Sequence, residues 1–194
     1  MLKIGLTGGI GSGKTTAARV FEMLGAPIYF ADARAKELMH TDELLRKKIQ
    51  ETFGDQIYKA QQLDRKALAK IVFNDEKALE KVNGLVHPVV RKDFHNWAQQ
   101  QDAPYVIEES AILFETGLYI DFDYLVSVIS PMEERIARLQ ERDNTTVEKI
   151  EARMKAQVND EIRKEKSDYI LKNGKDDLLL PQIIALDKVF KEKV

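Results

Sequence analysis

Hydrophobic positions follow two patterns that alternate along the chain. Short runs rich in β-branched and aromatic residues are typical of buried strands, and such runs cover residues 2–6, 27–30, 105–109, 124–130 and 169–171. Between them, apolar residues recur every three or four positions, which is typical of amphipathic helices. The alternation of strand and helix predicts an α/β fold with a five-stranded parallel sheet between layers of helices.

Helical periodicity outside the centre of the chain predicts helices over 14–24, 31–39, 131–142, 145–154, 161–166 and 177–190. Gly25 is placed to end the first of them, because glycine commonly follows a helix. Pro131 is expected at the start of its helix, where the missing N–H costs nothing. Pro181 lies inside the last range, so that helix is expected to start late or to bend.

Residues 41–101 differ from the rest of the chain, because helical runs follow one another there and no strand is predicted. The expected helices are 42–53, 65–73, 76–85 and 89–101. His87-Pro88 separates the last two, since proline disfavours the helical conformation in the residue before it. We interpret 41–101 as a helical insertion between two strands of a single domain, 1–194.

The composition excludes several classes of protein. Lys and Arg number 30 and Asp and Glu 32, a net charge of -2, so no basic excess indicates nucleic-acid binding. Without cysteine, the chain has no disulfide, thiolate metal site or cysteine nucleophile. No stretch has the length of a membrane span, and the chain opens on a strand rather than a signal peptide. We therefore expect a cytoplasmic protein with neither nucleic acid nor membrane as a partner.

The first predicted strand leads into a phosphate-loop motif. Gly8–Thr15 reads GGIGSGKT and fits G-x-x-x-x-G-K-[ST] at every position. Glycines let backbone N–H groups approach a polyphosphate, and the N-terminus of the next helix favours an anion. In such a motif Lys14 reaches the β- and γ-phosphates and the Thr15 hydroxyl binds Mg²⁺. The motif therefore predicts a nucleotide-phosphate site.

Carboxylates near the ends of two other strands are candidates for the same site, because parallel sheets bind ligands beyond the carboxyl ends of their strands. Asp32 follows the second strand, where it could be a general base, help to position Mg²⁺, or cap a helix. Glu108 and Glu109 end the third strand, and only one of the two can face the site. The alternative is that both are surface charges.

Three arginines, Arg135, Arg138 and Arg142, lie at spacings of three and four on one predicted helix. A row of guanidinium groups on one face could neutralise the charge of a transferred phosphoryl group. The alternative is pairing with neighbouring glutamates on a solvated face, and for Arg135 this alternative is favoured.

Several segments together resemble the dephospho-coenzyme A kinase family, over nearly the whole chain. They are LTGGIGSGKTT at 6–16, FADARAKEL at 30–38, VHPVV at 86–90, AILFE at 111–115, RLQERD at 138–143 and SDYILKNG at 167–174. Phe30 and Ala111 depart from the family pattern, which has aspartate and proline there, and Glu109 stands where the family often has aspartate. The resemblance implies a three-layer P-loop NTPase fold with a helical acceptor-binding insertion at 41–101 and a helical lid at 138–166.

The implied reaction is transfer of the ATP γ-phosphate to the ribose 3′-hydroxyl of dephospho-coenzyme A, with ATP as co-substrate and Mg²⁺ as cofactor. Residues implied in catalysis are Asp32 as general base, Lys14, Arg138 and Arg142. Those implied in ATP binding are Gly9, Gly11, Ser12, Gly13, Lys14, Thr15, Thr16, Asn173 and Gly174. Acceptor binding is implied for Asp32, His87 and Glu115, and Mg²⁺ is expected at Thr15, with Glu109 as a second candidate ligand.

Two other functions stay open at this point. One is a kinase for another small acceptor, such as a nucleoside monophosphate or shikimate, which the first 40 residues do not distinguish. The other is a nucleotide-dependent switch that hydrolyses GTP slowly. Against the switch, the chain has no Asn-Lys-x-Asp motif and no Asp-x-x-Gly segment after the third strand.

Overall fold

The computed structural model of the chain describes residues 1–59, 62–73 and 75–194. Contacts between residues divide it into two compact units, one of residues 1–30 and 101–194 and the other of residues 31–100. The helical unit therefore begins at Ala31, earlier than residue 41, where the sequence analysis placed the start of the insertion. Within the described ranges, no helix is both long enough and apolar enough to cross a membrane.

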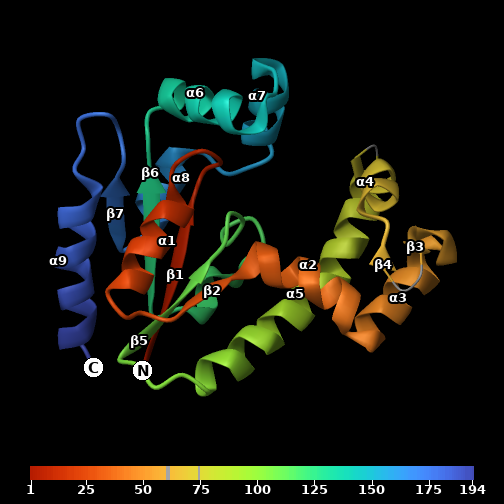
Figure 1. The fold of residues 1–194 in the computed structure, drawn as a ribbon, viewed down its shortest axis with the longest axis horizontal. Coiled ribbons are helices and arrows are strands. Elements are labelled where there is room, and N and C mark those ends of the chain that lie inside the picture. The colour runs from red at the N-terminus through yellow and green to blue at the C-terminus, as the bar shows by residue number, and fades with distance from the viewer. Residues whose placement is uncertain (60–61, 74) are drawn as a thin grey trace. The chain divides into compact units, whose positions relative to one another are not determined.

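The unit of residues 1–30 and 101–194 is built on a five-stranded parallel sheet, as predicted (Figure 1). Its strands are β1 (Leu2–Gly8), β2 (Ile28–Phe30), β5 (Tyr105–Glu109), β6 (Tyr124–Ile129) and β7 (Tyr169–Lys172), in the order β2-β5-β1-β6-β7. Leu6 of β1 lies opposite Glu109 of β5, and Gly8 lies opposite Val128 of β6. The loop after β1 thus starts between the carboxyl ends of two neighbouring strands, where such sheets bind ligands.

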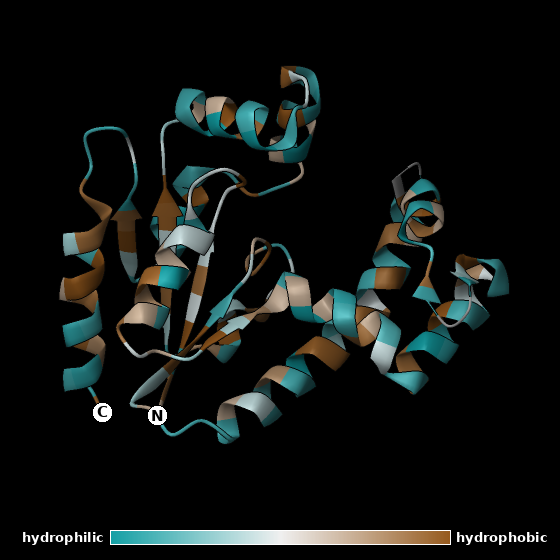
Figure 2. Cartoon of the chain, in the orientation of Figure 1, coloured by the Kyte–Doolittle hydropathy of each residue, from teal (hydrophilic) through white to brown (hydrophobic). Residues whose placement is uncertain are grey.

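The helices of this unit are α1 (Lys14–Met23), α6 (Met132–Asp143), α7 (Val147–Lys155), α8 (Asp160–Lys166) and α9 (Leu179–Glu192), with a 3₁₀ helix, η2 (Leu118–Asp121). Phe21 of α1 and Phe190 of α9 are fully buried in one apolar core with the strands. Figure 2 shows hydrophobic residues, in brown, along β6, β7 and parts of α9. Burial against helices explains why the strands read as nearly continuous apolar runs.

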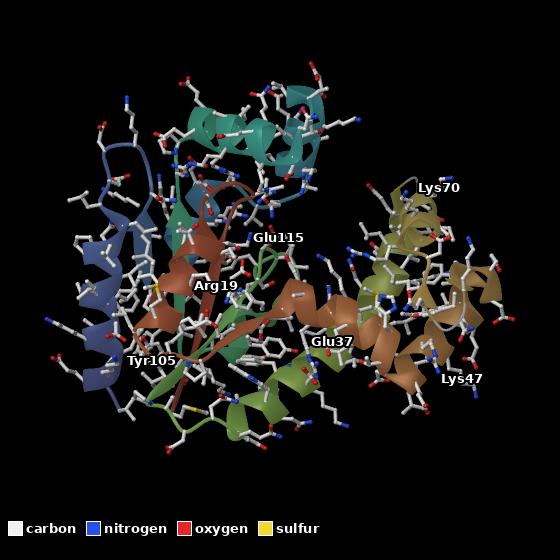
Figure 3. The ribbon with its side chains drawn as sticks, in the orientation of Figure 1. Arg19, Glu37, Lys47, Lys70, Tyr105 and Glu115 are labelled. Carbon is white, nitrogen blue, oxygen red and sulfur yellow. The ribbon has the colours of Figure 1, made fainter. Side chains whose placement is uncertain are left out.

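One buried polar pair lies at the start of β5, where Figure 3 labels Tyr105. The Tyr105 hydroxyl donates a hydrogen bond of 2.6 Å to Asp187 of α9, whose second oxygen accepts from Lys191 at 2.8 Å. The pKa of Tyr105 is raised above its ordinary value, mainly by burial and to a smaller extent by the neighbouring carboxylate of Asp187. The pair therefore ties α9 to the sheet by a bond in which both groups are satisfied.

The unit of residues 31–100 contains α2 (Ala31–Thr41), α3 (Glu43–Phe53), α4 (Arg65–Phe73) and α5 (Glu76–Gln99), with a 3₁₀ helix, η1 (Asp55–Ile57). Arg34 of α2 donates two hydrogen bonds, of 2.7 and 2.8 Å, to the carboxylate of Asp93 on α5. Such a paired, charge-assisted contact fixes both distance and orientation. It therefore holds α2, the helix that carries Asp32, against α5.

Two expectations for this unit were wrong. The predicted helices 76–85 and 89–101 form one helix, α5, with Pro88 inside it. Val82, Val86 and Val90 form a buried stripe at four-residue steps across the proline, so packing outweighs its local cost. Two short strands, β3 (Tyr58–Lys59) and β4 (Gln62–Leu63), also pair antiparallel where no strand was expected, because two-residue strands are too short to show alternation.

Three predictions about helix ends are confirmed. Gly25, with φ of +94°, directly follows the residue that caps α1. Pro131 immediately precedes α6, and its carbonyl accepts the N–H of Arg135. α9 starts late, at Leu179, which places Pro181 in the first turn, where its missing N–H breaks no helical hydrogen bond.

Candidate active site at the phosphate loop

The motif of residues 8–15 forms a tight loop between β1 and α1, and two of its glycines lie against other side chains. A Cβ at Gly9 would stand 2.1 Å from Arg135 Nη2. At Gly13, where φ is +93°, a Cβ would stand 2.1 Å from Asn173 Nδ2. The positive φ favours glycine at Gly13, whereas at Gly9 a side chain would require the guanidinium of Arg135 to shift.

Glu109, at the end of β5, meets the first residues of α1. Thr15 Oγ1 lies 3.4 Å and Lys14 Nζ 3.6 Å from the same Glu109 oxygen, Oε1. Glu109 is therefore the member of its pair that faces the loop. Glu108 is equally buried, so the alternative of two surface charges is wrong.

Arg138 of α6 joins the loop to the ends of two strands. It donates to the Gly11 carbonyl at 3.4 Å, to Ser130 Oγ at 3.0 Å and to the Asn173 carbonyl at 2.9 Å. It also donates to Glu134 at 2.9 Å. Arg138, predicted from its spacing, is thus brought to the loop.

Asn173 and Gly174 follow β7. Asn173 Nδ2 donates to the Ser12 carbonyl of the phosphate loop at 2.7 Å. The Gly174 N–H donates to Asp177 at 2.7 Å, which closes the turn after the strand. The structure thus brings Asn173 into contact with the loop, and Gly174 lies next to it.

Arg135 is buried, with 6% of its surface exposed, and the interpretation of a solvated face is wrong. Its Nε donates to the Ile10 carbonyl at 2.9 Å, and its Nη1 lies 3.3 Å from Asp160. Burial lowers the pKa of Arg135, and the charge of Asp160 opposes that shift. A signal was available, because Arg135 lies one helical turn before the buried apolar Leu139 and so shares its face.

Arg142, near the end of the same helix, has a different environment. Its guanidinium binds the neighbouring Asp143 through bonds of 2.7 and 3.0 Å, and its side chain is 62% exposed. Arg153 of α7 donates to the same carboxylate at 2.9 Å. The structure therefore places Arg142 in a surface pair, whereas Arg135 and Arg138 contact the loop.

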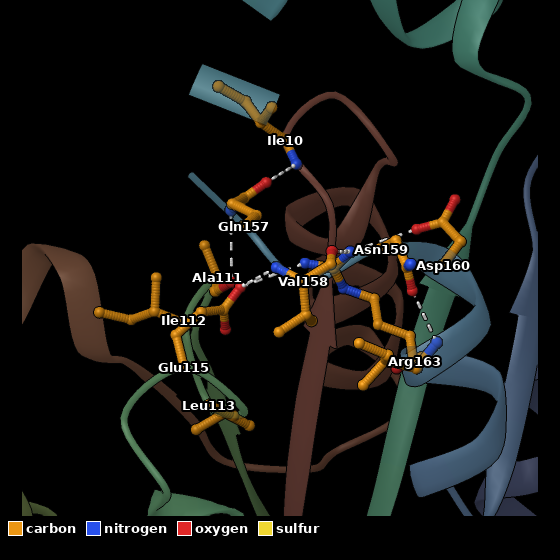
Figure 4. A network of polar contacts seen from close by, with 12 residues as sticks. Ile10, Ala111, Ile112, Leu113, Glu115, Gln157, Val158, Asn159, Asp160 and Arg163 are labelled. Atoms are coloured by element: carbon orange, nitrogen blue, oxygen red, sulfur yellow. Dashed lines mark hydrogen bonds and ion pairs between the residues drawn. The ribbon is translucent and has the colours of Figure 1, made fainter. Parts of the chain in front are cut away.

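Glu115 belongs to a network of polar contacts that the sequence analysis did not find (Figure 4). Its Oε1 accepts the Val158 N–H at 2.8 Å and lies 3.5 Å from Arg163 Nη2. Gln157 accepts the Ile10 N–H at 2.8 Å and donates to the Ala111 carbonyl at 3.3 Å. Thus residues 157–163 connect the phosphate loop to the 111–115 segment, and no motif pointed to Gln157.

Arg163 is the most enclosed charged residue of this network, with 1% of its surface exposed. It donates to the Val158 carbonyl and, at 3.2 Å, to Asp160. Asp160 therefore lies between two buried guanidinium groups, those of Arg135 and Arg163. The carboxylates of Asp160 and Glu115 pair with these buried positive charges.

The predicted residues Asp32 and His87 belong to the unit of residues 31–100. α2 begins at Ala31, so the exposed Asp32 stands in the first helical turn rather than before it, which argues against the cap alternative. His87 is half-buried on α5, and this burial lowers its pKa. Across the described residues, no group of three or more His, Cys, Asp or Glu side chains is arranged to hold a metal ion.

Comparison with known proteins gives one consistent family. The family model described as dephospho-CoA kinase matches residues 2–177. The dephospho-CoA kinase of Bacteroides fragilis is 34% identical over 194 residues, which is 100% of this chain and 95% of the relative.

Two solved structures resemble the chain along its whole length. A protein from Thermus thermophilus superposes with a TM-score of 0.84 at 31% identity, over 100% of this chain and 98% of the other. Dephospho-CoA kinase from Campylobacter jejuni superposes with a TM-score of 0.72 at 25% identity, over 99% of this chain and 98% of the other. Each alignment therefore spans both compact units of the chain.

Proposed function

The chain belongs to the dephospho-CoA kinase family, and we propose that it transfers the γ-phosphoryl group of ATP to the ribose 3′-hydroxyl of dephospho-coenzyme A. This reaction completes coenzyme A synthesis. The observation that carries the proposal is the phosphate loop whose Lys14 and Thr15 both meet Glu109. Kinase activity toward a nucleoside monophosphate or shikimate becomes the less favoured alternative, since the family match covers residues 2–177.

The loop and its contacts form the ATP half of the proposed site. Backbone N–H groups of the ATP-binding residues would surround the phosphates, and Lys14 would balance the charge of the β- and γ-phosphates. Asn173 already contacts the loop through Ser12, which supports a place for Asn173 and Gly174 near the adenine. The residues in this proposed half are Gly9, Gly11, Ser12, Gly13, Lys14, Thr15, Thr16, Asn173 and Gly174.

Thr15 and Glu109 would hold Mg²⁺. Their side-chain oxygens approach to 3.4 Å at the end of the loop, and hydroxyl and carboxylate oxygens are the ligand types that this hard cation takes. A bound Mg²⁺ would neutralise charge on the phosphates. Lys14, next to the same carboxylate, would place a second positive charge there.

Asp32 is the proposed general base on the acceptor side, where its exposed carboxylate is open to a ligand. The 3′-oxygen of the acceptor attacks the γ-phosphorus while the bond to the bridging oxygen of ADP breaks. The hydroxyl proton passes to the Asp32 carboxylate. His87 and the 41–101 helices are proposed to bind the acceptor, together with Glu115.

Residues 138–166 are proposed as a lid whose closure excludes water from the reaction. Arg138 already contacts the loop through Gly11, which supports a role in binding phosphates. Arg142 would have to leave Asp143 to join it. A cytoplasmic location remains a prediction from the sequence.

The test is ADP formation from MgATP with one acceptor at a time. Dephospho-coenzyme A should accelerate ADP formation strongly, and AMP or shikimate should leave the slow hydrolysis rate unchanged. A rate that responds to AMP or shikimate instead would identify another acceptor. Hydrolysis that no acceptor changes would favour the nucleotide-dependent switch.

A further inference from the structure

Ile10, in the middle of the phosphate loop, is held by side chains at both of its backbone polar groups. Its N–H donates to Gln157 Oε1 at 2.8 Å, and its carbonyl accepts from Arg135 Nε at 2.9 Å. Arg135 lies in α6, and Gln157 lies just beyond the end of α7. One side chain from α6 and one from the segment after α7 thus bind the same loop residue (Figure 4 shows the Gln157 contact).

Both side chains are themselves fixed. Gln157 Nε2 donates to the Ala111 carbonyl at 3.3 Å. Arg135 is 6% exposed, packs against Gly9 where a Cβ would clash, and pairs with Asp160 at 3.3 Å. A side chain anchored at several points orients its partner more firmly than a mobile surface residue does.

The two bonds set the direction of the loop's own donors, because a trans peptide unit is planar and its C=O and N–H point in opposite directions. Arg135 holds the Ile10 carbonyl, so the N–H of Gly11 in the same peptide points away from Arg135. Gln157 holds the Ile10 N–H, so the Gly9 carbonyl points away from Gln157, and that carbonyl accepts the Ser12 N–H at 3.0 Å.

We propose that Arg135 and Gln157 are positioning residues that clamp Ile10 and thereby preset the N–H donors of the loop for the phosphates of a nucleotide. The clamp rests on the proposed function only in that the loop binds nucleotide, and it does not depend on the acceptor. Binding of ADP therefore tests it separately from phosphoryl transfer.

The first experiment compares Gln157→Leu with Lys188→Leu, which introduces the same residue at an exposed position of α9, outside the proposed lid. Calorimetry should show ADP, with Mg²⁺, binding about three- to tenfold more weakly to Gln157→Leu, the scale of one lost hydrogen bond. The KM for ATP should rise by the same factor, while the melting temperature and the KM for dephospho-coenzyme A stay unchanged. Lys188→Leu should match the wild type. ADP affinity within twofold of the wild type in Gln157→Leu would overturn the clamp.

The second experiment tests whether the two side chains act on the same residue. Arg135→Lys keeps a charge opposite Asp160 but loses the Nε donor to Ile10. If both contacts preset one loop geometry, the double variant should lose less ADP affinity than the product of the two single losses. Independent, multiplicative losses would overturn the proposal.

A third measurement does not depend on how Arg135→Lys folds. The amide hydrogen of Ile10 should exchange slowly in the wild type and faster in Gln157→Leu, while amides of the sheet keep their protection. Equal exchange at Ile10 would overturn the proposal. Wild-type protein that binds ADP but does not phosphorylate dephospho-coenzyme A would refute the proposed function and leave the clamp standing.

Discussion

The phosphate loop and the helical unit of residues 31–100 hold their candidate residues in different ways. Around the loop, Arg135 and Arg138 come from α6 and Asn173 comes from the turn after β7, and each hydrogen-bonds a loop carbonyl. In the helical unit, Asp32 is exposed on the first turn of α2 and His87 is half-buried on α5.

This difference separates the preformed phosphate loop from the proposed acceptor half, whose groups are open to a ligand. Backbone donors of a phosphate site must be oriented before the anion arrives, because reorientation would cost binding free energy. A general base, in contrast, must be free to accept a proton from the bound substrate. We therefore expect loop variants to act on nucleotide binding and transfer together, and Asp32 variants to act on transfer alone.

Lys14→Ala should have the largest effect, because it removes the charge beside the phosphates in the preformed half. We expect kcat/KM to fall by about 10³-fold. Steady-state ADP release with dephospho-coenzyme A measures it, and Lys188→Ala, at an exposed position of α9, is the control. Full activity of Lys14→Ala would show that the phosphate loop does not take part in the transfer.

Asp32→Asn should separate phosphoryl transfer from nucleotide binding most clearly, since it changes only the proposed acceptor half. The amide cannot take the proton, so kcat should fall by about 10²-fold or more. The KM for ATP should stay near that of the wild type, as it should in the control Asp102→Asn, at an exposed position before β5. Unchanged turnover would exclude Asp32 as the base.

Glu109→Gln tests the metal ligands of the loop half. The amide is a weaker ligand for Mg²⁺ than a carboxylate, so the Mg²⁺ concentration for half-maximal rate should rise roughly tenfold. Titration of the rate with Mg²⁺ at fixed ATP measures it. Glu22→Gln, on the exposed end of α1, is the control. If both variants need the same Mg²⁺ concentration for half-maximal rate, Glu109 is not a ligand.

The smallest expected effect concerns His87 and the stability of the helical unit. Burial lowers the pKa of His87, so the folded protein binds this proton less tightly than the unfolded chain does. The contribution of neutral His87 to the free energy of unfolding is therefore fully present above the ordinary histidine pKa of about 6.5. It is lost as the pH falls below that value.

Urea unfolding at pH 7.5 and 5.5 measures this loss. His87→Gln should lose less unfolding free energy between the two pH values than the wild type, and His95→Gln on the same helix is the control. An equal loss in His87→Gln would show that His87 does not contribute to the pH dependence.

The sheet, the loop and most helices could be predicted because their signals are local. The motif at 8–15 defines a strand, a turn and a helix within a few residues, and Gly25 and Pro181 give helix ends. α5 was divided wrongly because the local rule at Pro88 was given more weight than the valine stripe that crosses it. That stripe was visible in the sequence.

The contacts around Ile10 could be predicted only in part. Arg138 was found from its spacing, but Arg135 was judged from the glutamates near it rather than from the buried face it shares with Leu139. Gln157 carries no motif, and its partners Ile10 and Ala111 are 147 and 46 residues away. Only the fold brings such distant residues together.

The most direct test of the account follows the labelled phosphoryl group. With ATP labelled at the γ-phosphate and dephospho-coenzyme A present, the label should appear in coenzyme A in a one-to-one ratio with ADP. Asp32→Asn should slow this transfer without diverting the label. Label that accumulates in inorganic phosphate while coenzyme A stays unlabelled would contradict the claim that the loop and the helical unit serve one kinase reaction.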